Sequence, residues 1–493
     1  MQPEEYVTIL RDLNEQIGRL NGRVEELEQR NQALEARNQE LEARNAELET
    51  ENKRLKEMLH EKGAAKEAKA PVFKENYSVE QQTGKKSKRG RDATGRRHPA
   101  DKLSLVSRDV DVYPDGVAQK KCIEQRQQYA WRIIEGRAAY VCDHIYGIAG
   151  SVALPEVAGL RNSRSEYGIE IILTVAFLHY WIGISLDHVC EVMQFFTGLS
   201  LSKSQANSLL EQLSSDWAQE YETIAALLAL QLVLDVDETA WQVGKQSCYT
   251  WVFSSVLHVL FRCGVGRGKA EAQAIVGAAF GGIGVSDDDG AYQHLFAEHQ
   301  LGWAHLLRKA IKLMLQHPNQ PSYREFFHDL YALYQQAVRW QNDHRLTVGR
   351  GPKVEQLQAR VRQLCTRSDE VIDKEAMPIQ EQSFIRLQHE LINGLDSLFV
   401  FVQHPQVEPT NNRSERNLRR EAEVRKGGRT SNTPSGAQRR SIMMTVLATL
   451  DTRFEKFTLQ HLLDELTRWS QVGLSRFQLE LSGMTLANPP PLV

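Results

Sequence analysis

The sequence predicts an α/β fold in which a sheet-containing core is interrupted by an all-helical insertion and preceded by a long coiled coil and a small mixed module. Three observations carry this prediction: a leucine heptad at the amino terminus, strand-like segments ending in acids after residue 231, and a polar helical stretch over 317–408. A chain of 493 residues is long enough for about three domains at the usual domain size.

The first segment, 1–60, predicts a parallel two-stranded coiled coil. Leucine recurs at the d position of the heptad, and asparagine occupies four successive a positions. In a parallel dimer in register, the charged residues at g of one helix face residues of opposite charge at e of the other. We therefore expect a homodimer through residues 6–59, with a single solvated helix as the alternative. The leucines that recur every seven residues are Leu13, Leu20, Leu27, Leu34, Leu41, Leu48 and Leu55.

Residues 61–100 predict a flexible basic linker. Within it, 85–97 contains seven basic residues and one acid, a composition suited to phosphate contacts without base reading. A basic linker that is simply solvated is an equally open alternative. The linker residues expected to contact DNA are Lys85, Lys86, Lys88 and Arg89.

Residues 101–230 predict a small strand module, seen in runs such as WRIIEGRAAYVC, followed by helices from 167. The last of these helices has Ser202 or Ser204 as its amino-terminal cap. Two helices joined by FTGLSLS could form a DNA-binding helix-turn-helix, although an ordinary helical bundle is favoured over it.

The apolar segment 169–186 is the best candidate for a membrane span. It contains Glu170 and His179 and is marginal in length, so we expect a buried helix and no membrane association. The chain opens without a signal peptide pattern. The six cysteines lack any C-x-x-C spacing, which argues against a zinc ribbon and a disulfide scaffold. These features indicate a cytoplasmic protein, nucleoid-associated when bound to DNA.

The segment 231–316 predicts the first part of the catalytic core. A strand over 231–236 ends in Asp235, Asp237 and Glu238, and burying such acids requires pairing, hydrogen bonds or a cation. Further strands within 249–263, a helix and a short strand before SDDDG give a ribonuclease H-like order. Asp287 then stands where a second metal ligand belongs, although spacing alone does not choose among three aspartates and the motif is also a good turn.

The next segment, HQLGWAHLLRKAIKLML, predicts a short strand and an amphipathic helix whose His305 and Arg308 could contact DNA or be packing or surface groups. Residues 317–408 predict the helical insertion, in which no chemistry is evident. Residues 456–493 predict a carboxy-terminal helix and tail.

Residues 409–455 predict the second part of the core. Between 411 and 440 stand nine basic residues and three acids, and Glu415 lies one helical turn before Arg419. Glu415 could alternatively be part of an exposed ion pair. The arginines could alternatively form a basic surface patch that binds no ligand. The residues of this stretch expected to contact DNA phosphates are Arg413, Arg416, Arg419, Arg420, Arg425, Lys426 and Arg429.

Three ordered blocks of this chain resemble the bacterial insertion-sequence-sixty-six transposases. They are DVDETAW at 235–241, VSDDDGAY with HQLGWAHLLRK at 285–309, and PTNNRSERNLRR through RKGG at 409–428. The resemblance implies a DDE triad of Asp237, Asp287 and Glu415. It also implies cleavage and strand transfer of DNA at the element's terminal repeats and accessory transposition proteins as further partners.

Three carboxylates brought together repel one another unless divalent cations neutralise them, and oxygen ligands suit Mg²⁺ or Mn²⁺. Two ions about 4 Å apart would serve phosphodiester hydrolysis and strand transfer. The chain departs from the family pattern in lacking its cysteine zinc module, so we expect no zinc site. The competing hypothesis is a catalytically inactive or helper-dependent dimeric DNA-binding protein.

Overall fold

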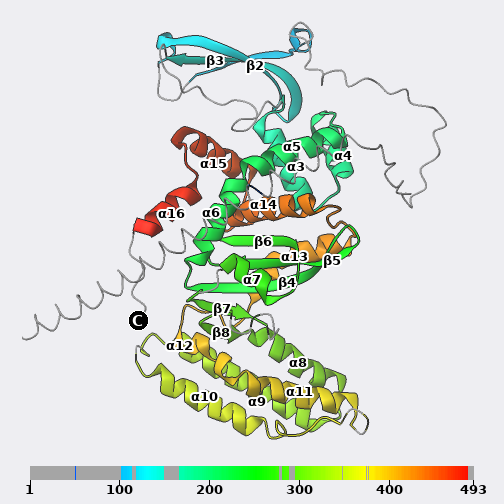
Figure 1. Ribbon diagram of the computed structural model, residues 1–493, viewed down its shortest axis with the longest axis vertical. Helices are drawn as coiled ribbons and strands as arrows, with labels where there is room; N and C mark the ends of the chain where they lie inside the picture. The colour runs from blue at the N-terminus through cyan, green and yellow to red at the C-terminus, as the bar shows by residue number, and fades with distance from the viewer. Residues whose placement is uncertain are drawn as a thin grey trace, which may run out of the picture. The chain divides into compact units, whose positions relative to one another are not determined.

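The computed structural model describes most of the chain after residue 101 (Figure 1). The chain divides into two compact units, 1–94 and 95–493, and every element below belongs to the second. The predicted coiled coil and basic linker lie outside the described residues, apart from residue 50. The described residues are 50, 102–113, 118–148, 166–276, 280–287, 292, 295–346, 348–373, 375 and 377–486.

A three-stranded sheet forms the small module, in the order β1-β3-β2. β2 and β3 are an antiparallel hairpin whose two-residue turn places Glu135 and Gly136 at φ angles of 53° and 78°, as a type I′ turn requires. β1 pairs in parallel with β3. The elements are β1 (Arg108–Val112), η1 (Gln119–Lys121), β2 (Cys122–Ile134) and β3 (Arg137–Ile148).

A group of helices follows, and it buries the apolar segment over 169–186. Ile171 is fully buried, and the carboxylate of Glu170 accepts a 2.8 Å hydrogen bond from Arg132 of β2. No helix in the described part of the chain is long and apolar enough to cross a membrane, which agrees with the predicted buried helix. Ser202 caps α5 through a capping box. The elements are α3 (Ile169–Ala176), the π-helical turn η2 (Phe177–Trp181), α4 (Leu186–Thr197), α5 (Lys203–Asp216) and α6 (Ala218–Ala229).

The central sheet has five strands in the order β6-β5-β4-β7-β8. β4, β5 and β6 are antiparallel neighbours, whereas β4, β7 and β8 run parallel. The strand and helix order is the one expected from 231 onward. The elements are β4 (Val233–Val243), β5 (Gln246–Ser254), β6 (Val259–Val265), α7 (Lys269–Val276), β7 (Ile283–Ser286) and β8 (Glu298–Leu301).

The prediction that the first core strand ends at its acids is wrong. β4 continues through Asp235, Asp237 and Glu238 because its antiparallel pairing with β5 runs on to Val243. Its parallel pairing with β7 stops at Asp235. The acids therefore mark the point where the neighbouring parallel strand ends.

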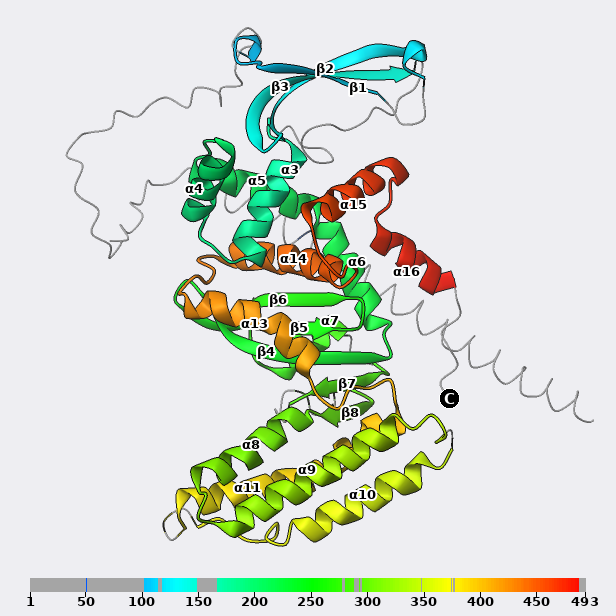
Figure 2. The same ribbon diagram turned by 180° about the vertical axis from the view of Figure 1, so that it is seen from behind.

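Two helices from the carboxy-terminal part of the chain pack on this sheet, α13 (Asn412–Lys426) along β4 and β5 and α14 (Pro434–Asp451) along β6 (Figures 1 and 2). β6 is an edge strand of the sheet. Ser441, Thr445 and Thr449, each one turn apart on α14, accept hydrogen bonds of 2.9–3.1 Å from backbone N–H groups of β6. α14 thereby accepts hydrogen bonds from backbone N–H groups of β6 that would otherwise be unpaired at the edge of the sheet and could pair with a strand of another chain.

Helices over residues 303–403 form a second hydrophobic cluster, which also includes Val285 of β7 and Leu301 of β8. After α14, two helices follow instead of the single one expected, because Gly473 adopts a left-handed φ of 77° and ends the first of them. The elements are α8 (Trp303–Gln316), α9 (Pro321–Gln341), α10 (Arg350–Leu364), α11 (Ile379–Asn393), η4 (Leu395–Ser397), α12 (Val400–Gln403), α15 (Leu459–Val472) and α16 (Arg476–Leu486).

Candidate active site

Asp237 and Asp287 lie at equivalent positions relative to two neighbouring parallel strands. Asp235 of β4 pairs with Val285 of β7, and each candidate acid stands two residues further along the chain, Asp237 within β4 and Asp287 directly after the end of β7. Since side chains alternate along a strand, a step of two keeps the same face of the sheet. Neighbouring strands lie about 4.8 Å apart, so the two carboxylates can reach one space.

Glu415 comes to the same strands from the first turn of α13. Two polar contacts fix this helix on the sheet. The guanidinium of Arg413 lies 2.5 Å from the buried carboxylate of Asp235, and the amide of Asn417 donates a 2.9 Å hydrogen bond to Ser254 of β5. These contacts stand on either side of Glu415 in the helix, and they hold its first turn over the acids of β4.

The electrostatics of Asp237 show that the three acids act on one another. Burial, the negative charge of Asp287, that of Glu238 and that of Glu415 raise the pKa of Asp237 to about 8. The N–H of Glu238 donates a 2.9 Å hydrogen bond to the Asp237 carboxylate, which opposes this rise in pKa only in part. Burial is the largest cause of the raised pKa, and the neighbouring negative charges add to it.

Glu415 is held by the guanidinium of Arg308 on α8, and the imidazole of His305 lies nearby. Both of its carboxylate oxygens accept hydrogen bonds from Arg308, at 2.8 and 3.0 Å, and Nδ1 of His305 lies 3.6 Å away. The sequence suggested His305 and Arg308 as groups that could contact DNA or be packing or surface groups. The contact of His305 and Arg308 with Glu415 joins residues more than one hundred positions apart, so no short sequence pattern predicts it. The sequence instead suggested an ion pair between Glu415 and Arg419, one helical turn away.

Glu238, the last acid of the DxDE motif, has partners of its own. Arg267 donates a 3.1 Å hydrogen bond to one carboxylate oxygen, and the hydroxyl of Tyr292 donates a short one to the other. Burial and the charge of Glu238 raise the pKa of Tyr292 far above its ordinary value. Glu238 is therefore engaged in structural contacts beside Asp237.

A family model described as "Transposase IS66 family" matches residues 164–439, more than half of the chain and a range that contains all three acids. The chain belongs to this family. A search of curated proteins finds no match. The motif blocks at 235–241, 285–309 and 409–428 thus lie within a transposase family domain, as their resemblance implied.

In this member of the transposase family, the basic residues between 413 and 429 divide into two groups. Arg413 is engaged with Asp235 and Glu408, Arg420 stacks on the ring of Trp181 at 3.9 Å, and Arg425 donates to a backbone carbonyl. These three hold the fold together. The basic residues that are exposed, and so accessible to a phosphate, are Arg416, Arg419, Lys426 and Arg429. The expected contacts at Lys85, Lys86, Lys88 and Arg89 lie outside the described residues.

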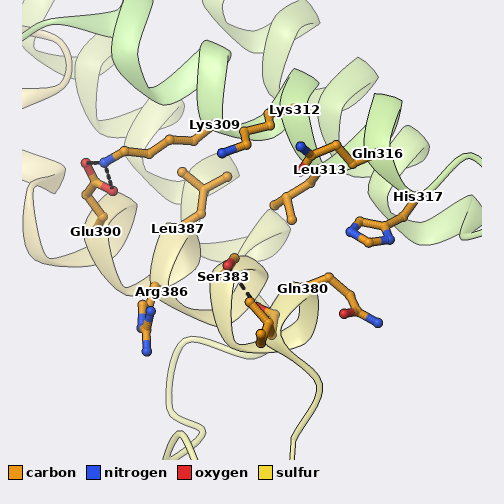
Figure 3. Close-up of a pocket in the computed structure, with 11 residues that line it drawn as sticks. Lys309, Lys312, Leu313, Gln316, His317, Gln380, Ser383, Arg386, Leu387 and Glu390 are labelled. Atoms are coloured by element: carbon orange, nitrogen blue, oxygen red, sulfur yellow. Dashed lines mark hydrogen bonds and ion pairs between the residues drawn. The ribbon is translucent and has the colours of Figure 1, made fainter. Parts of the chain in front are cut away.

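A cavity of about 520 Å³ lies between α8 and α11, and none of the three acids lines it (Figure 3). Lys309 on its wall donates to both carboxylate oxygens of Glu390, at 2.5 and 2.6 Å. The side chains of Lys312 and Arg386 add positive charge to its lining. The hollow is therefore basic, and it lies between α11 of the insertion, in which the sequence indicated no chemistry, and α8, whose Arg308 pairs with Glu415.

Proposed function

We propose that this chain is a DNA transposase of a bacterial insertion sequence, with Asp237, Asp287 and Glu415 as a DDE triad. The observation that carries the proposal is geometric: Asp237 and Asp287 stand two residues beyond paired residues of β4 and β7, and α13, which packs along β4, carries Glu415. Burial raises the pKa of Asp237, and the charges of Asp287, Glu238 and Glu415 add to the rise. The acids of the triad are separated by 50 and 128 positions in the chain, so their mutual influence arises from the fold.

The sheet supports a ribonuclease H-like core as part of this proposal. Three antiparallel strands are followed by two parallel strands on the side of β4, with a helix between β6 and β7. The first strand carries Asp237, Asp287 directly follows the fourth, and the helical insertion separates both from the helix that carries Glu415. This order of elements supports the proposal that the three acids form one site.

Mg²⁺ or Mn²⁺ fits the donor set, because all three side chains offer carboxylate oxygens and their negative charge is what a divalent cation would neutralise. Two bound ions would supply an electrophile for the phosphodiester and an activated water or 3′-hydroxyl. The chain itself supplies placement: β4 and β7 fix two carboxylates, and Arg308 holds the third. Arg308 would have to release Glu415 when that carboxylate becomes a ligand, and its guanidinium is then free to contact a phosphate.

DNA is the expected partner, and the exposed cations of α13 support the expectation. Arg416, Arg419 and Lys426 recur at spacings of three and seven residues, which places them on one face of the helix that begins beside Glu415. A homodimer through 6–59 would bring two such sites to two element ends. We further propose that the protein acts in the cytoplasm on the nucleoid and with accessory transposition proteins.

The test is cleavage and joining of duplexes that carry the terminal inverted repeats flanking the reading frame. The wild-type chain should cut the repeat end and join it to target DNA only with Mg²⁺ or Mn²⁺. Asp237→Asn, Asp287→Asn and Glu415→Gln should each abolish both steps while repeat binding persists. Glu423→Gln, a change at an exposed acid on the same helix as Glu415, is the matched control and should retain activity.

The Arg308–Glu415 ion pair favours a second candidate, a dimer that binds DNA but needs a helper protein to complete its site. In that case the purified chain binds the repeats without cutting them under either metal, and activity appears when the neighbouring proteins are added. Cleavage that persists in all three triad variants would instead exclude the triad.

A further inference from the structure

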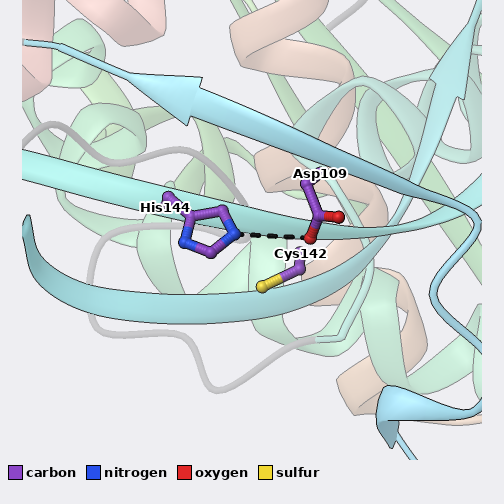
Figure 4. A group of neighbouring side chains, drawn as sticks. All are labelled: Asp109, Cys142 and His144. Carbon is purple, nitrogen blue, oxygen red and sulfur yellow. Dashed lines mark hydrogen bonds and ion pairs between the residues drawn. The ribbon is translucent and has the colours of Figure 1, made fainter.

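The small sheet brings together three side chains of different chemistry, outside the candidate active site. Asp109 of β1 pairs in register with Cys142 of β3, and His144 lies two residues beyond Cys142 on the same face. One oxygen, one sulfur and one nitrogen atom of these residues all lie within 4.8 Å of one another (Figure 4). Nε2 of His144 is 3.3 Å from the Asp109 carboxylate.

The surroundings orient the histidine for ligation. Its Nδ1 lies 2.9 Å from the carboxylate of Glu124 on β2, so Nδ1 carries a proton and donates it. Gln127 donates a 3.0 Å hydrogen bond to the same carboxylate. The other ring nitrogen, Nε2, pairs with the Asp109 carboxylate and would lose its proton on binding a metal. A carboxylate behind a metal-bound histidine is the usual way in which proteins fix the tautomer and raise ligand basicity.

We propose that Asp109, Cys142 and His144 bind one zinc ion, which fastens β1 to β3. Thiolate, imidazole and carboxylate together suit Zn²⁺, whereas Mg²⁺ prefers oxygen alone. Zinc bonds of roughly 2.0–2.3 Å in tetrahedral geometry put donor atoms roughly 3.3–3.6 Å apart. The His144–Asp109 distance already meets this spacing, and the side chain of Asp109 is exposed.

The need for such a link follows from the burial of β1. Its five residues are exposed or half-buried, so little apolar surface holds this edge strand on the sheet. Cys142 is only 3 % exposed, which would shield a zinc–sulfur bond from water. The proposal reverses the expectation that the chain has no zinc site, because that expectation considered paired cysteines and this donor set is assembled across two strands.

Cobalt is the probe that separates this site from the carboxylate triad, which contains no sulfur. The full chain, reduced and free of metal, is titrated with Co²⁺, and absorption from thiolate-to-cobalt charge transfer is recorded. We expect the band at one equivalent and its loss when Zn²⁺ is added. Cys142→Ser should abolish the band, whereas Cys122→Ser, a change at a half-buried thiol on the same sheet, should leave it unchanged.

Two further variants keep the test informative if Cys142→Ser does not fold. Glu124→Gln retains every ligand and should weaken Co²⁺ binding about 10- to 100-fold, the usual effect of losing a carboxylate behind a metal-bound histidine. His144→Ala should remove stoichiometric binding. In the wild type, Zn²⁺ should slow hydrogen exchange of the β1 amides. Absence of the band in the wild type, or an equal band in Cys142→Ser, would overturn the proposal.

Discussion

Replacing Asp237 with asparagine tests the electrostatics of the candidate site without any DNA. The pKa of Asp237 is about 8 in the folded protein, against about 3.9 in an unfolded chain. Between these values the native state keeps a proton that the unfolded state has lost. Native stability therefore falls as pH rises through this window, by about 1.4 kcal/mol per pH unit for one such group.

Asparagine does not titrate, so Asp237→Asn escapes this loss. Between pH 5.5 and pH 8, the difference in free energy of unfolding between the variant and the wild type should rise by about 3 kcal/mol in favour of the variant. This value follows from the release of one proton on unfolding of the wild type over that interval. The assay is urea unfolding of the core in the presence of a chelator, repeated across the pH range. Adding Mg²⁺ at pH 8 should then stabilise the wild type and leave the variant unchanged, because the cation neutralises only the ionised carboxylate.

The matched control is Asp329→Asn on α9, an exposed aspartate far from the triad in the chain. Its unfolding free energy should follow the wild type at every pH. A constant difference between Asp237→Asn and the wild type across the range would refute the reasoning, since Asp237 would then carry no raised pKa and no uncompensated charge.

Three further predictions concern the helices around the site. Arg308→Ala removes the cation that competes for Glu415, a partly exposed pair worth up to about 1 kcal/mol, and should lower the Mg²⁺ concentration for half-maximal thermal stabilisation by up to about fivefold. Arg440→Leu strips the buried carboxylate of Glu421 of its bidentate partner and should cost about 3–5 kcal/mol in urea unfolding, most of which the double change to leucine restores. Arg419→Ala should weaken DNA binding and reduce the slope of log affinity against log salt by about 0.9, measured by fluorescence anisotropy.

Two controls separate these effects from general charge changes. Lys312→Ala, at an exposed residue one turn beyond Arg308, should leave the Mg²⁺ dependence unchanged. Arg362→Ala, at an exposed position of α10, should leave the salt slope unchanged. If Arg362→Ala weakens DNA binding as much as Arg419→Ala, the face of α13 has no special role.

The local patterns predicted much of the architecture. Helices after 167, the strand and helix order after 231 and the cap at Ser202 all follow from periodicity and capping chemistry, which depend on neighbours in the chain. The strand containing Asp237 extended further than predicted. Local sequence does not show that β4 stops pairing with β7 at Asp235 while its pairing with β5 continues to Val243.

The division of the basic residues also needed the fold. In the sequence, Arg413 and Arg416 are equivalent members of one charged stretch. In the structure, Arg413 forms an ion pair with the buried carboxylate of Asp235, whereas Arg416 remains exposed. A long charged side chain pairs with whichever opposite charge the fold brings near it. For Arg413 that charge lies on a strand almost two hundred residues earlier in the chain.

The sequence by itself determined the family, the candidate acids and the order of the elements, because each rests on residue types at short spacings. Only the tertiary structure decided which charges meet: Asp237 with Asp287 and Glu415, Glu415 with Arg308, and His144 with Asp109 and Cys142. Electrostatic and coordinate bonds act over a few ångströms in space, whatever the distance along the chain, so strand register and helix placement fixed these partners.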